Sequence, residues 1–426
     1  MSRGAVLVLD GHTTQALACV RSLGLAGYPV LVASHRRWPL AAWSQHCRGE
    51  LRLGAETVEA FGAMRRWAAD RGVRFVLPLT ERTCRLCNAE RAQWEALGVT
   101  VGCGEDEMLL RAFDKAQTLA GAESCGLRVP PTRLPQSEDE CLAAAAELGY
   151  PCVIKPRFSN AWIDDQFLPA QGPAYVGCAT ELLHAVRTRR QGSYWPLLQG
   201  VVAGQGRGIF GLYDHGRAVA WFAHERLRDV RPSGSGSSLR RSAALSARLL
   251  GPAERLLSAM NWHGPAMVEF RDEGSGPPCL MEVNGRFWGS LQLAVAAGVD
   301  FPRLWLEILA GSPPPPQVAY TEGVTLRWLW GDVKRFAAIM LGPPARQTAR
   351  YPGRLHGVRE LLGPQPPGTR LETWQRADPW PAVGEWVQGL EELVVGLRPN
   401  GRAERVARTN GNGRASAVTA GEEGPQ

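Results

Sequence analysis

The residues of this chain that are best suited to chemistry are two glutamates and an asparagine near the ends of two apolar segments. Glu269 lies in the segment MVEF, and Glu282 and Asn284 lie in the segment LMEVN. If both segments are strands, Glu282 and Asn284 point to the same face, because side chains alternate along a strand. A hairpin loop over residues 274–278 would bring Glu269 back beside them. Carboxylate and amide oxygens of this kind are the ligands that Mg²⁺ prefers, together with phosphate oxygens and water.

Basic residues strengthen the case for a phosphate site. Arg286 follows Asn284 by two positions, and its guanidinium suits a phosphate or carboxylate through two parallel hydrogen bonds. A single acid at a strand end is usually an ordinary exposed residue, but four polar residues on one face favour a site. Only three of the 48 basic residues are lysines. Because lysine offers a compact point charge where arginine offers a planar fork, we interpret Lys115 and Lys155 as phosphate contacts and Lys334 as a surface residue.

The N-terminal part predicts the elements that would hold one side of such a site. Apolar runs that read as strands cover residues 5–9, 30–33, 75–79 and 99–102, and amphipathic stretches that read as helices cover residues 14–26 and 58–69. This alternation is typical of a parallel sheet with helices on its faces. Ligands of such sheets bind beyond the carboxyl ends of the strands, here near Asp10–Thr14 and Thr80–Arg82. No GxGxxG motif follows the first run, so a dinucleotide site is not indicated.

From Phe113 onward the pattern changes to mixed helices and short strands. Predicted helices cover residues 114–125, 138–148 and 245–260, and predicted strands cover residues 153–155, 197–202, 209–213, 218–224, 266–270 and 279–283. The glycine-rich stretch 204–208 is not followed by a helix, so we predict a turn there rather than a phosphate loop. Residues 230–238 contain two Ser-Gly pairs and predict a loop.

Composition excludes several classes of protein. The net charge of +7 is spread along the chain without a long run of like charges, which argues against a nucleic-acid partner. No stretch approaches the ~18 apolar residues of a membrane span, and the apolar run at residues 5–9 is too short for a signal peptide. Ten cysteines without such a signal predict reduced thiols and a cytoplasmic location. Cys84 and Cys87 fall on one face of a predicted helix, where a redox or zinc role is not expected.

The ordered motifs resemble those of the ATP-grasp ligases. The resemblance rests on FDK ending at Lys115, VIKP around Lys155, LQGVV starting at Leu198, VEF around Glu269 and EVN starting at Glu282. The continuation NGRFWGS, which starts at Asn284, is especially similar to the branch of carbamoyl-phosphate-synthase-like or carboxylate–amine ligases. The resemblance covers roughly residues 5–310, and the order of the motifs carries more weight than any one of them.

This resemblance implies a role for each motif residue. Lys115 and Lys155 would contact the phosphates of ATP, and the backbone of Gln199, Gly200, Val201 and Val202 would hold the adenine. Glu269, Glu282 and Asn284 would bind one or two Mg²⁺ ions, with Mn²⁺ as an alternative. Arg286 would steady the transferred phosphoryl group or an acyl phosphate. Arg240 is a weaker candidate for the same task, because Arg241 beside it could serve instead, and residues 230–238 would cover the substrate.

The resemblance also implies the domain organisation. The fold class is α/β and α+β: an ATP-grasp fold preceded by a Rossmann-like parallel-sheet domain. We predict the N-terminal domain at residues 1–111 and the ATP-grasp domain at 112–312, with a small lid subdomain at about 130–202 and a larger metal and substrate subdomain at about 203–312. A Trp-rich helical appendage would cover residues 313–399, after the proline run 313–316, and a disordered tail would cover 400–426.

The implied activity is that of an ATP-dependent carboxylate–amine ligase. Phosphoryl transfer to a carboxylate would make an acyl phosphate, an amine would displace phosphate, and ADP and phosphate would be released. No protein nucleophile is needed, which matches the absence of a convincing Ser-His or Cys-His arrangement; His12 and His224 are interpreted as structural or substrate-contacting. The expected partners are a small-molecule carboxylate and an amine, and a homodimer is compatible with the sequence. The alternatives are a phosphotransferase or carboxylase on the same fold, and a catalytically weakened ATP-binding homologue.

Three departures from the family pattern leave that last alternative open. Gly200 stands where the hinge usually carries an acid, and no acid follows at the usual ribose-contact distance, so ribose recognition is not explained. The loop after Lys155 lacks the glycines that often cover phosphates and offers Arg157, Ser159 and Asn160 instead.

Overall fold

Five parallel strands form the N-terminal sheet of the protein, which we describe from a computed structural model. The described residues are 4–54, 57–163, 166–232, 236–312, 319–343 and 351–397. The strand order is β3-β2-β1-β4-β5. The strands are β1 (Ala5–Val8), β2 (Val30–Ser34), β3 (Cys47–Arg52), β4 (Val73–Leu77) and β5 (Thr100–Val101). Strands β1 and β2 are buried along their whole length, as expected of parallel strands covered on both faces.

The helices of this part begin at side chains that cap them. They are α1 (Thr14–Leu25), α2 (Val58–Ala69), α3 (Glu81–Ala89) and α4 (Arg91–Ala96), with a short 3-10 helix over Leu40–Trp43. The side chains of Thr13, Thr57 and Thr80 each accept a hydrogen bond from a backbone N–H in the first turn of α1, α2 and α3. The capped start of α3 directly follows β4, so its first residues lie at the carboxyl end of the sheet.

The alternating elements of this sheet were predicted correctly except for two details. Strand β3 was missed, because CRGELR is polar and its exposure alternates along an edge strand. Strand β4 begins two residues before the predicted run.

A small antiparallel sheet with two helices follows. Its order is β10-β7-β11-β6, from β6 (Thr132–Arg133), β7 (Cys152–Lys155), β10 (Ala174–Val176) and β11 (Leu197–Gly200). Helices α7 (Glu138–Leu148) and α8 (Ala179–Arg189) pack on it through apolar residues such as Cys141, Ile154 and Leu182. After Lys155 the chain forms the two-stranded ribbon β8 (Asn160–Ile163) and β9 (Gln166–Pro169).

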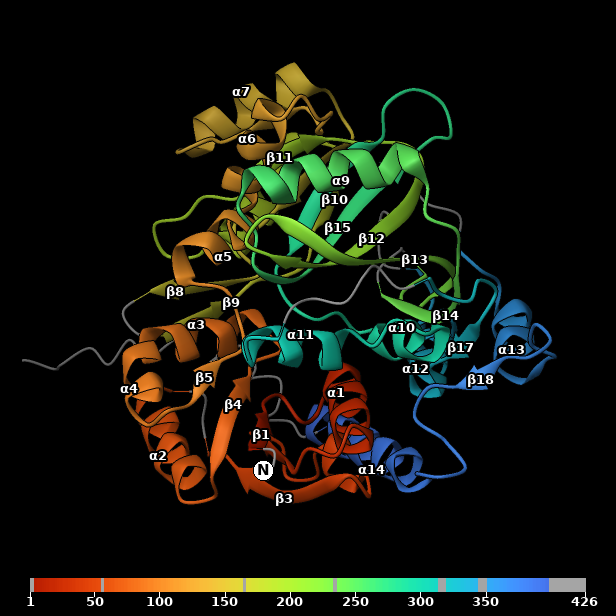
Figure 1. Cartoon of the computed structure of the whole chain (residues 1–426). Coiled ribbons are helices and arrows are strands. Elements are labelled where there is room, and N and C mark those ends of the chain that lie inside the picture. Colours follow the sequence, from red (N-terminus) through yellow and green to blue (C-terminus); the bar gives the residue numbers. More distant parts are fainter. Residues whose placement is uncertain are drawn as a thin grey trace, which may run out of the picture. The chain divides into compact units, whose positions relative to one another are not determined.

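The third sheet has seven strands in the order β16-β15-β12-β13-β14-β17-β18. They are β12 (Gln205–Asp214), β13 (Arg217–Asp229), β14 (Ser237–Ser242), β15 (Gly264–Asp272), β16 (Cys279–Asn284), β17 (Thr325–Arg327) and β18 (Arg370–Leu371). Helix α9 (Ala247–Ala259) packs on β12 and β13 (Figure 1).

The predicted turn over residues 204–208 is wrong. Strand β12 begins at Gln205, and Gly206 and Gly208 pair with Arg271 and Glu269 of β15. Backbone pairing with the neighbouring strand outweighs the low strand propensity of glycine at these positions. Strand β13 also runs five residues beyond the predicted end at His224.

The remaining helices connect the sheets. They are α5 (Asp106–Phe113), α6 (Lys115–Ser124), α10 (Leu291–Ala297), α11 (Phe301–Leu309), α12 (Leu329–Leu341), α13 (Arg354–Leu362) and α14 (Trp380–Leu397). Helix α1 packs on α10 and α11, which joins the N-terminal sheet to the large sheet through a shared apolar core. The helices α12–α14 were expected, whereas β17 and β18, which extend the large sheet, were not.

Some parts of the predicted organisation lie outside the described residues. These are the proline run 313–316 and the tail 400–426, and the three domain boundaries stay predictions. The chain divides into two compact units after Gln388, and every contact described below lies within the first unit. Among the helices of the described ranges, none combines the length and the apolar character that crossing a membrane needs.

A buried ion pair ties the C-terminal segment to α1. Arg21 donates from Nε to Asp378 Oδ2 at 2.8 Å, and the two side chains are only 3% and 1% exposed. Asp378 also accepts from Ser44 Oγ at 2.8 Å and from the backbone N–H of Gln45 at 2.9 Å. The carboxylate therefore accepts from three donors at once, of which those of Arg21 and Ser44 are buried.

We expect Asp378→Ala to lower the free energy of unfolding by about 3–5 kcal/mol, because it leaves a buried guanidinium without its partner. The matched control is Glu307→Ala, which removes the acid of the more exposed Arg303–Glu307 pair. Its cost should stay within about 1 kcal/mol. Urea denaturation of both variants measures the difference, and equal losses would show that the buried pair has no special structural role.

Candidate active site

The two glutamates singled out in the sequence lie directly opposite each other. Strands β15 and β16 pair antiparallel, with Glu269 opposite Glu282 and Met267 opposite Asn284. The predicted pairing of these strands is therefore confirmed. Asn284 Nδ2 donates to Glu282 Oε1 at 3.4 Å, and Arg286 Nη2 donates to Asn284 Oδ1 at 3.1 Å. The cluster thus forms one chain of polar contacts along the edge of the large sheet.

Lys115 and Lys155 belong to other elements, and their charges affect Glu282 of this cluster. Lys115 is the first residue of α6, and its Nζ lies 3.4 Å from Ser159 Oγ. Lys155 is the last residue of β7. Burial lowers the pKa of its ammonium, and the charge of Glu282 acts to raise it. Burial acts to raise the pKa of Glu282, but the charges of Lys115, Lys155 and Arg286, together with the hydrogen bond from Asn284, lower it overall. The third lysine, Lys334, instead lies over the ring of Trp328, 5.5 Å from its centre.

The facing carboxylates of Glu269 and Glu282 show whether this site suits a metal ion. Burial and the charge of Glu282 raise the pKa of Glu269. Arg226 of β13 opposes this shift, with its Nη2 3.0 Å from Glu269 Oε2. Two carboxylates that repel each other, with an amide oxygen beside them, fit a divalent cation such as Mg²⁺. The sequence analysis missed Arg226, because the predicted strand ended two residues before it.

A third carboxylate enters the cluster from the N-terminal sheet. Glu81 is the first residue of α3, and burial raises its pKa while the charges of Arg286 and Lys115 oppose the shift. Its Oε2 is enclosed and has no hydrogen-bond partner among the described residues. The sequence had indicated residues 80–82 as a ligand-binding end of the sheet, but the role of Glu81 appears only when the two parts are packed together.

The hinge residues lie at the end of the small sheet. Gln199 is buried in β11, and its Nε2 donates to Thr132 Oγ1 at 2.9 Å. The backbone N–H of Gly200 donates to the carbonyl of Pro131 at 2.9 Å. Val201 and Val202 follow the strand, and Val201 is half exposed. The described geometry therefore leaves the backbone beyond Gly200 as the better candidate for an adenine contact.

Arg240 and Arg241 face different surroundings. Arg240 is buried, forms an ion pair with Glu372, and lies with Nη2 3.4 Å from the carbonyl of Gly289. Arg241 binds Glu225 through Nε at 2.7 Å and is partly exposed. Gly289 belongs to the segment that follows Asn284, so Arg240 is the arginine that contacts this segment. Its proposed contact with the reacting groups stays a prediction.

The structure also contains a Ser-His pair that the sequence analysis did not expect. His224 Nε2 lies 2.8 Å from Ser290 Oγ, and the His224 ring stacks on Phe210 at 4.5 Å. Burial lowers the pKa of His224 well below its usual range. Both residues are only 6% exposed, and His224 Nδ1 has no hydrogen-bond partner among the described residues. An enclosed pair without a third orienting group favours a structural role, as expected for His224.

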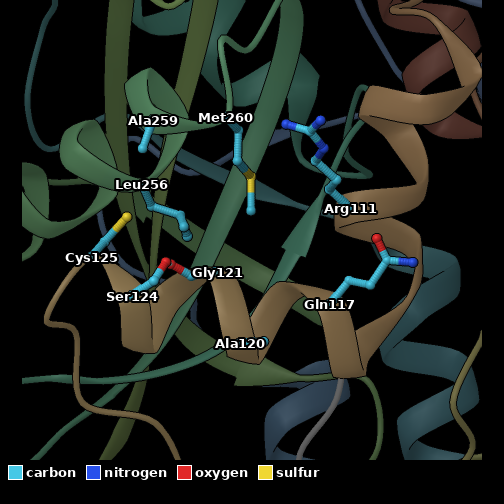
Figure 2. Close-up of a pocket in the computed structure, with 9 residues that line it drawn as sticks. All are labelled: Arg111, Gln117, Ala120, Gly121, Ser124, Cys125, Leu256, Ala259 and Met260. Carbon is cyan, nitrogen blue, oxygen red and sulfur yellow. The ribbon is translucent and has the colours of Figure 1, made fainter.

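A hollow of about 360 Å³ lies away from these residues (Figure 2). It is lined by α6 residues such as Gln117 and Ser124 and by Leu256, Ala259 and Met260 at the end of α9. None of the residues of the carboxylate and lysine cluster lines it, so it is not part of the candidate site.

Comparisons with known proteins agree with the fold described above. A family model described as "ATP-grasp in the biosynthetic pathway with Ter operon" matches residues 197–331, which run from β11 into α12. Biotin carboxylase from Campylobacter jejuni, solved as a β,γ-ATP complex, has a similar structure, with a TM-score of 0.61 at 13% identity. The similarity covers 76% of this chain and 75% of that chain. N5-carboxyaminoimidazole synthetase from Staphylococcus aureus, complexed with ADP, has a TM-score of 0.57 at 11% identity, over 75% of this chain and 81% of that chain.

The fold is that of the ATP-grasp proteins, and residues 197–331 match an ATP-grasp family model. The expected ATP-grasp fold with its N-terminal parallel sheet is thereby confirmed. A D-alanine--D-alanine ligase from Pseudomonas fluorescens (strain Pf0-1) is 26% identical over 213 residues, which cover 47% of this chain. The match spans 63% of the length of that ligase. The family model includes Glu269, Glu282 and Arg286, whereas Lys115 and Lys155 precede the matched residues.

We expect Lys155→Arg to weaken ATP binding about tenfold, or about 1.4 kcal/mol. The longer planar guanidinium does not replace a buried ammonium at the end of β7. Lys334→Arg is the matched control, since it makes the same chemical change beside Trp328. Isothermal titration of both variants with ATP measures the effect, and unchanged affinity for Lys155→Arg would contradict the phosphate assignment.

Proposed function

We propose that this ATP-grasp protein is an ATP-dependent carboxylate–amine ligase that works through an acyl phosphate and releases ADP and phosphate. The observation that carries the proposal is the convergence of Glu269 and Glu282 with Lys115, Lys155 and Arg286. Such a set neutralises transferring phosphate and needs no protein nucleophile. The ligase relatives and the nucleotide-bound structural neighbours support the same class of chemistry.

The first step would transfer the γ-phosphoryl group of ATP. An oxygen of the substrate carboxylate attacks the γ-phosphorus, the bond to the β-phosphate oxygen breaks, and ADP leaves. Lys115 and Lys155 would hold the phosphates by charge, and Arg286 would bind the oxygens of the transferred group. Glu269, Glu282 and Asn284 would hold Mg²⁺, which when bound neutralises phosphate oxygens and positions them for in-line transfer.

The second step would form the amide. The amine nitrogen attacks the acyl carbon, the carbon–oxygen bond to phosphate breaks, and the amine loses a proton. Glu81 offers an enclosed carboxylate oxygen beside Arg286 and Lys115, and its raised pKa favours acceptance of that proton. Because Glu81 is the first residue of α3, this assignment gives the N-terminal part of the chain a role in the amide-forming step.

The cellular location and the oligomeric state of the protein stay predictions. All ten cysteines lie in the described part of the chain and are free thiols, and the cytoplasmic location stays a prediction from the sequence. A homodimer is compatible with the fold, and the carboxylate and the amine are not identified.

The alternative is that the protein is a carboxylase or a phosphotransferase on the same fold. The similarity to a biotin carboxylase structure supports this alternative. Hydroxylamine separates the two, since it traps an acyl phosphate as a hydroxamate. A screen of acids and amines for phosphate release should give ADP and a hydroxamate from the active acid. Release of AMP and pyrophosphate would overturn the acyl-phosphate mechanism, and ATP binding without turnover over the whole panel would favour a weakened homologue.

We expect Glu282→Gln to lower phosphate release by about a hundredfold or more, because the amide carries no charge at the proposed metal site. Glu273→Gln is the matched control, as Glu273 is an exposed acid in the loop between β15 and β16. Phosphate release at saturating ATP and Mg²⁺ measures both variants. Full activity of Glu282→Gln would rule out its assignment as a metal ligand.

We expect Glu81→Gln to lower kcat about tenfold to a hundredfold while leaving the Kd for ATP within about twofold. Glutamine keeps the shape of the side chain but cannot accept the proton of the amine. Hydroxamate formation should be less affected than amide formation, since hydroxylamine is a nucleophile even without a strong base. Equal losses in ATP affinity and in both reactions would assign Glu81 a structural role instead.

A further inference from the structure

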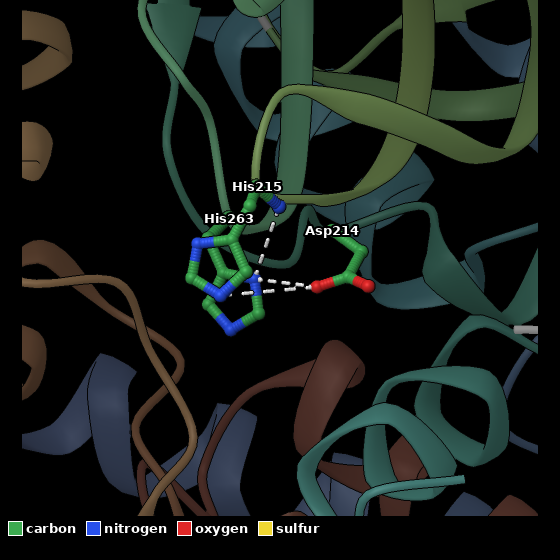
Figure 3. Close-up of side chains that lie close together, drawn as sticks. All are labelled: Asp214, His215 and His263. Atoms are coloured by element: carbon green, nitrogen blue, oxygen red, sulfur yellow. Dashed lines mark hydrogen bonds and ion pairs between the residues drawn. The ribbon is translucent and has the colours of Figure 1, made fainter. Parts of the chain in front are cut away.

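A second cluster of ligand-type side chains lies at the turn between β12 and β13. Asp214 ends β12, His215 follows it in the turn, and His263 immediately precedes β15 (Figure 3). Asp214 Oδ1 lies 3.3 Å from His263 Nδ1 and 3.9 Å from His215 Nε2. One ligand atom from each of the three residues lies within 4.8 Å of the other two. The ligase chemistry proposed above uses none of them.

We propose that Asp214, His215 and His263 bind one divalent transition-metal ion of the zinc type, with water completing a tetrahedral shell. Metal–nitrogen and metal–oxygen bonds of about 2.0–2.2 Å in a tetrahedron place two ligand atoms about 3.3 Å apart. The Asp214–His263 separation already has this value. Two imidazoles with one carboxylate select transition metals over Mg²⁺, which prefers oxygen ligands.

The ring of His215 can complete the site by turning. The two imidazoles now stack with 4.1 Å between their centres and 13° between their planes. The His215 side chain is 71% exposed, so rotation about its side-chain bonds meets little obstruction. His263 and Asp214 are less exposed, at 23% and 28%, and would form the held side of the site.

The backbone of the turn is unusual for its residue. His215 has φ 45° and Gly216 has φ 77°, so both central residues of this hairpin turn are left-handed. Two-residue turns of this kind normally carry Asn-Gly or Asp-Gly, and histidine is among the other residues that adopt positive φ. The turn therefore accommodates His215 and presents its imidazole beside His263.

His263 is held in place by two contacts with other elements. Its ring packs edge-on against Trp305 at 4.9 Å, and Trp305 Nε1 donates to the carbonyl of Gly102 at 3.0 Å. Its backbone N–H lies 3.2 Å from the sulfur of Met108. The turn is tied to the same strand, because the N–H of Gly216 donates to the carbonyl of Trp262 at 2.7 Å. A bound ion would therefore link the β12–β13 hairpin to the start of β15.

This site is separate from the proposed magnesium site. Gly264 pairs with Tyr213 at one end of β15, whereas Glu269 pairs with Gly208 five residues further along. Five residues of extended strand correspond to about 17 Å. Binding at the histidines can therefore be tested without reference to ligase activity.

The test uses the full chain without an affinity tag, stripped of metal by a chelator, and titrated with Zn²⁺ and with Co²⁺. We expect one ion per chain, and a Co²⁺ absorption spectrum of nitrogen and oxygen ligands without the charge-transfer band of cysteine thiolate. His215→Asn keeps a residue that tolerates positive φ, so it should fold, and it should bind Zn²⁺ at least tenfold more weakly. His263→Gln should do the same.

The matched control is His356→Ala, which removes another histidine that lies 3.3 Å from a carboxylate, that of Glu360. It should bind Zn²⁺ with unchanged affinity. Equal affinity of the wild type and His215→Asn, or a thiolate band with Co²⁺, would overturn the proposal and leave Asp214 and His263 as an ion pair only. Because metal binding is the readout, a failed ligase assay does not affect this result.

Discussion

The register between β15 and β16 is the constraint on which the candidate site depends. It places Glu269 directly opposite Glu282, and like charges at opposed strand positions destabilise a sheet. The charges that offset this repulsion come from elsewhere: Lys115 from α6, Lys155 from β7, and Arg226 from β13. The acids are thus tolerated only when three other elements are packed around them. A site with this balance of charge is well suited to take up a cation and phosphate together.

The N-terminal sheet is part of the same arrangement. It contributes Glu81 to the carboxylate cluster, and the Thr14 hydroxyl at the start of α1 donates to the carbonyl of Gly289 at 2.9 Å. Helix α1 is in turn held to the C-terminal segment by the buried pair of Arg21 and Asp378. The segment after Asn284 therefore contacts α1, which is itself held to the C-terminal segment.

Much of the fold could be predicted because its core elements have strong local patterns. The buried strands β1 and β2 follow from apolar runs, and the helices α1 and α2 follow from amphipathic stretches. The failures share a cause, since β3, the start of β12 and the end of β13 are polar or glycine-rich and are strands only through their neighbours. Arg226 was missed for this reason, although Glu269 beside it was found.

The sequence by itself determined the order of the ATP-grasp motifs, which is a linear property of the chain, and the placing of Glu282 and Asn284 on one face, because side chains alternate along a strand. Only the tertiary structure decided that Arg240 rather than Arg241 contacts the segment after Asn284, that Glu81 joins the cluster, and that His215 meets His263 across 48 positions. These contacts join residues that are distant in the chain. They depend on strand register, and a shift of one residue would turn each side chain to the opposite face.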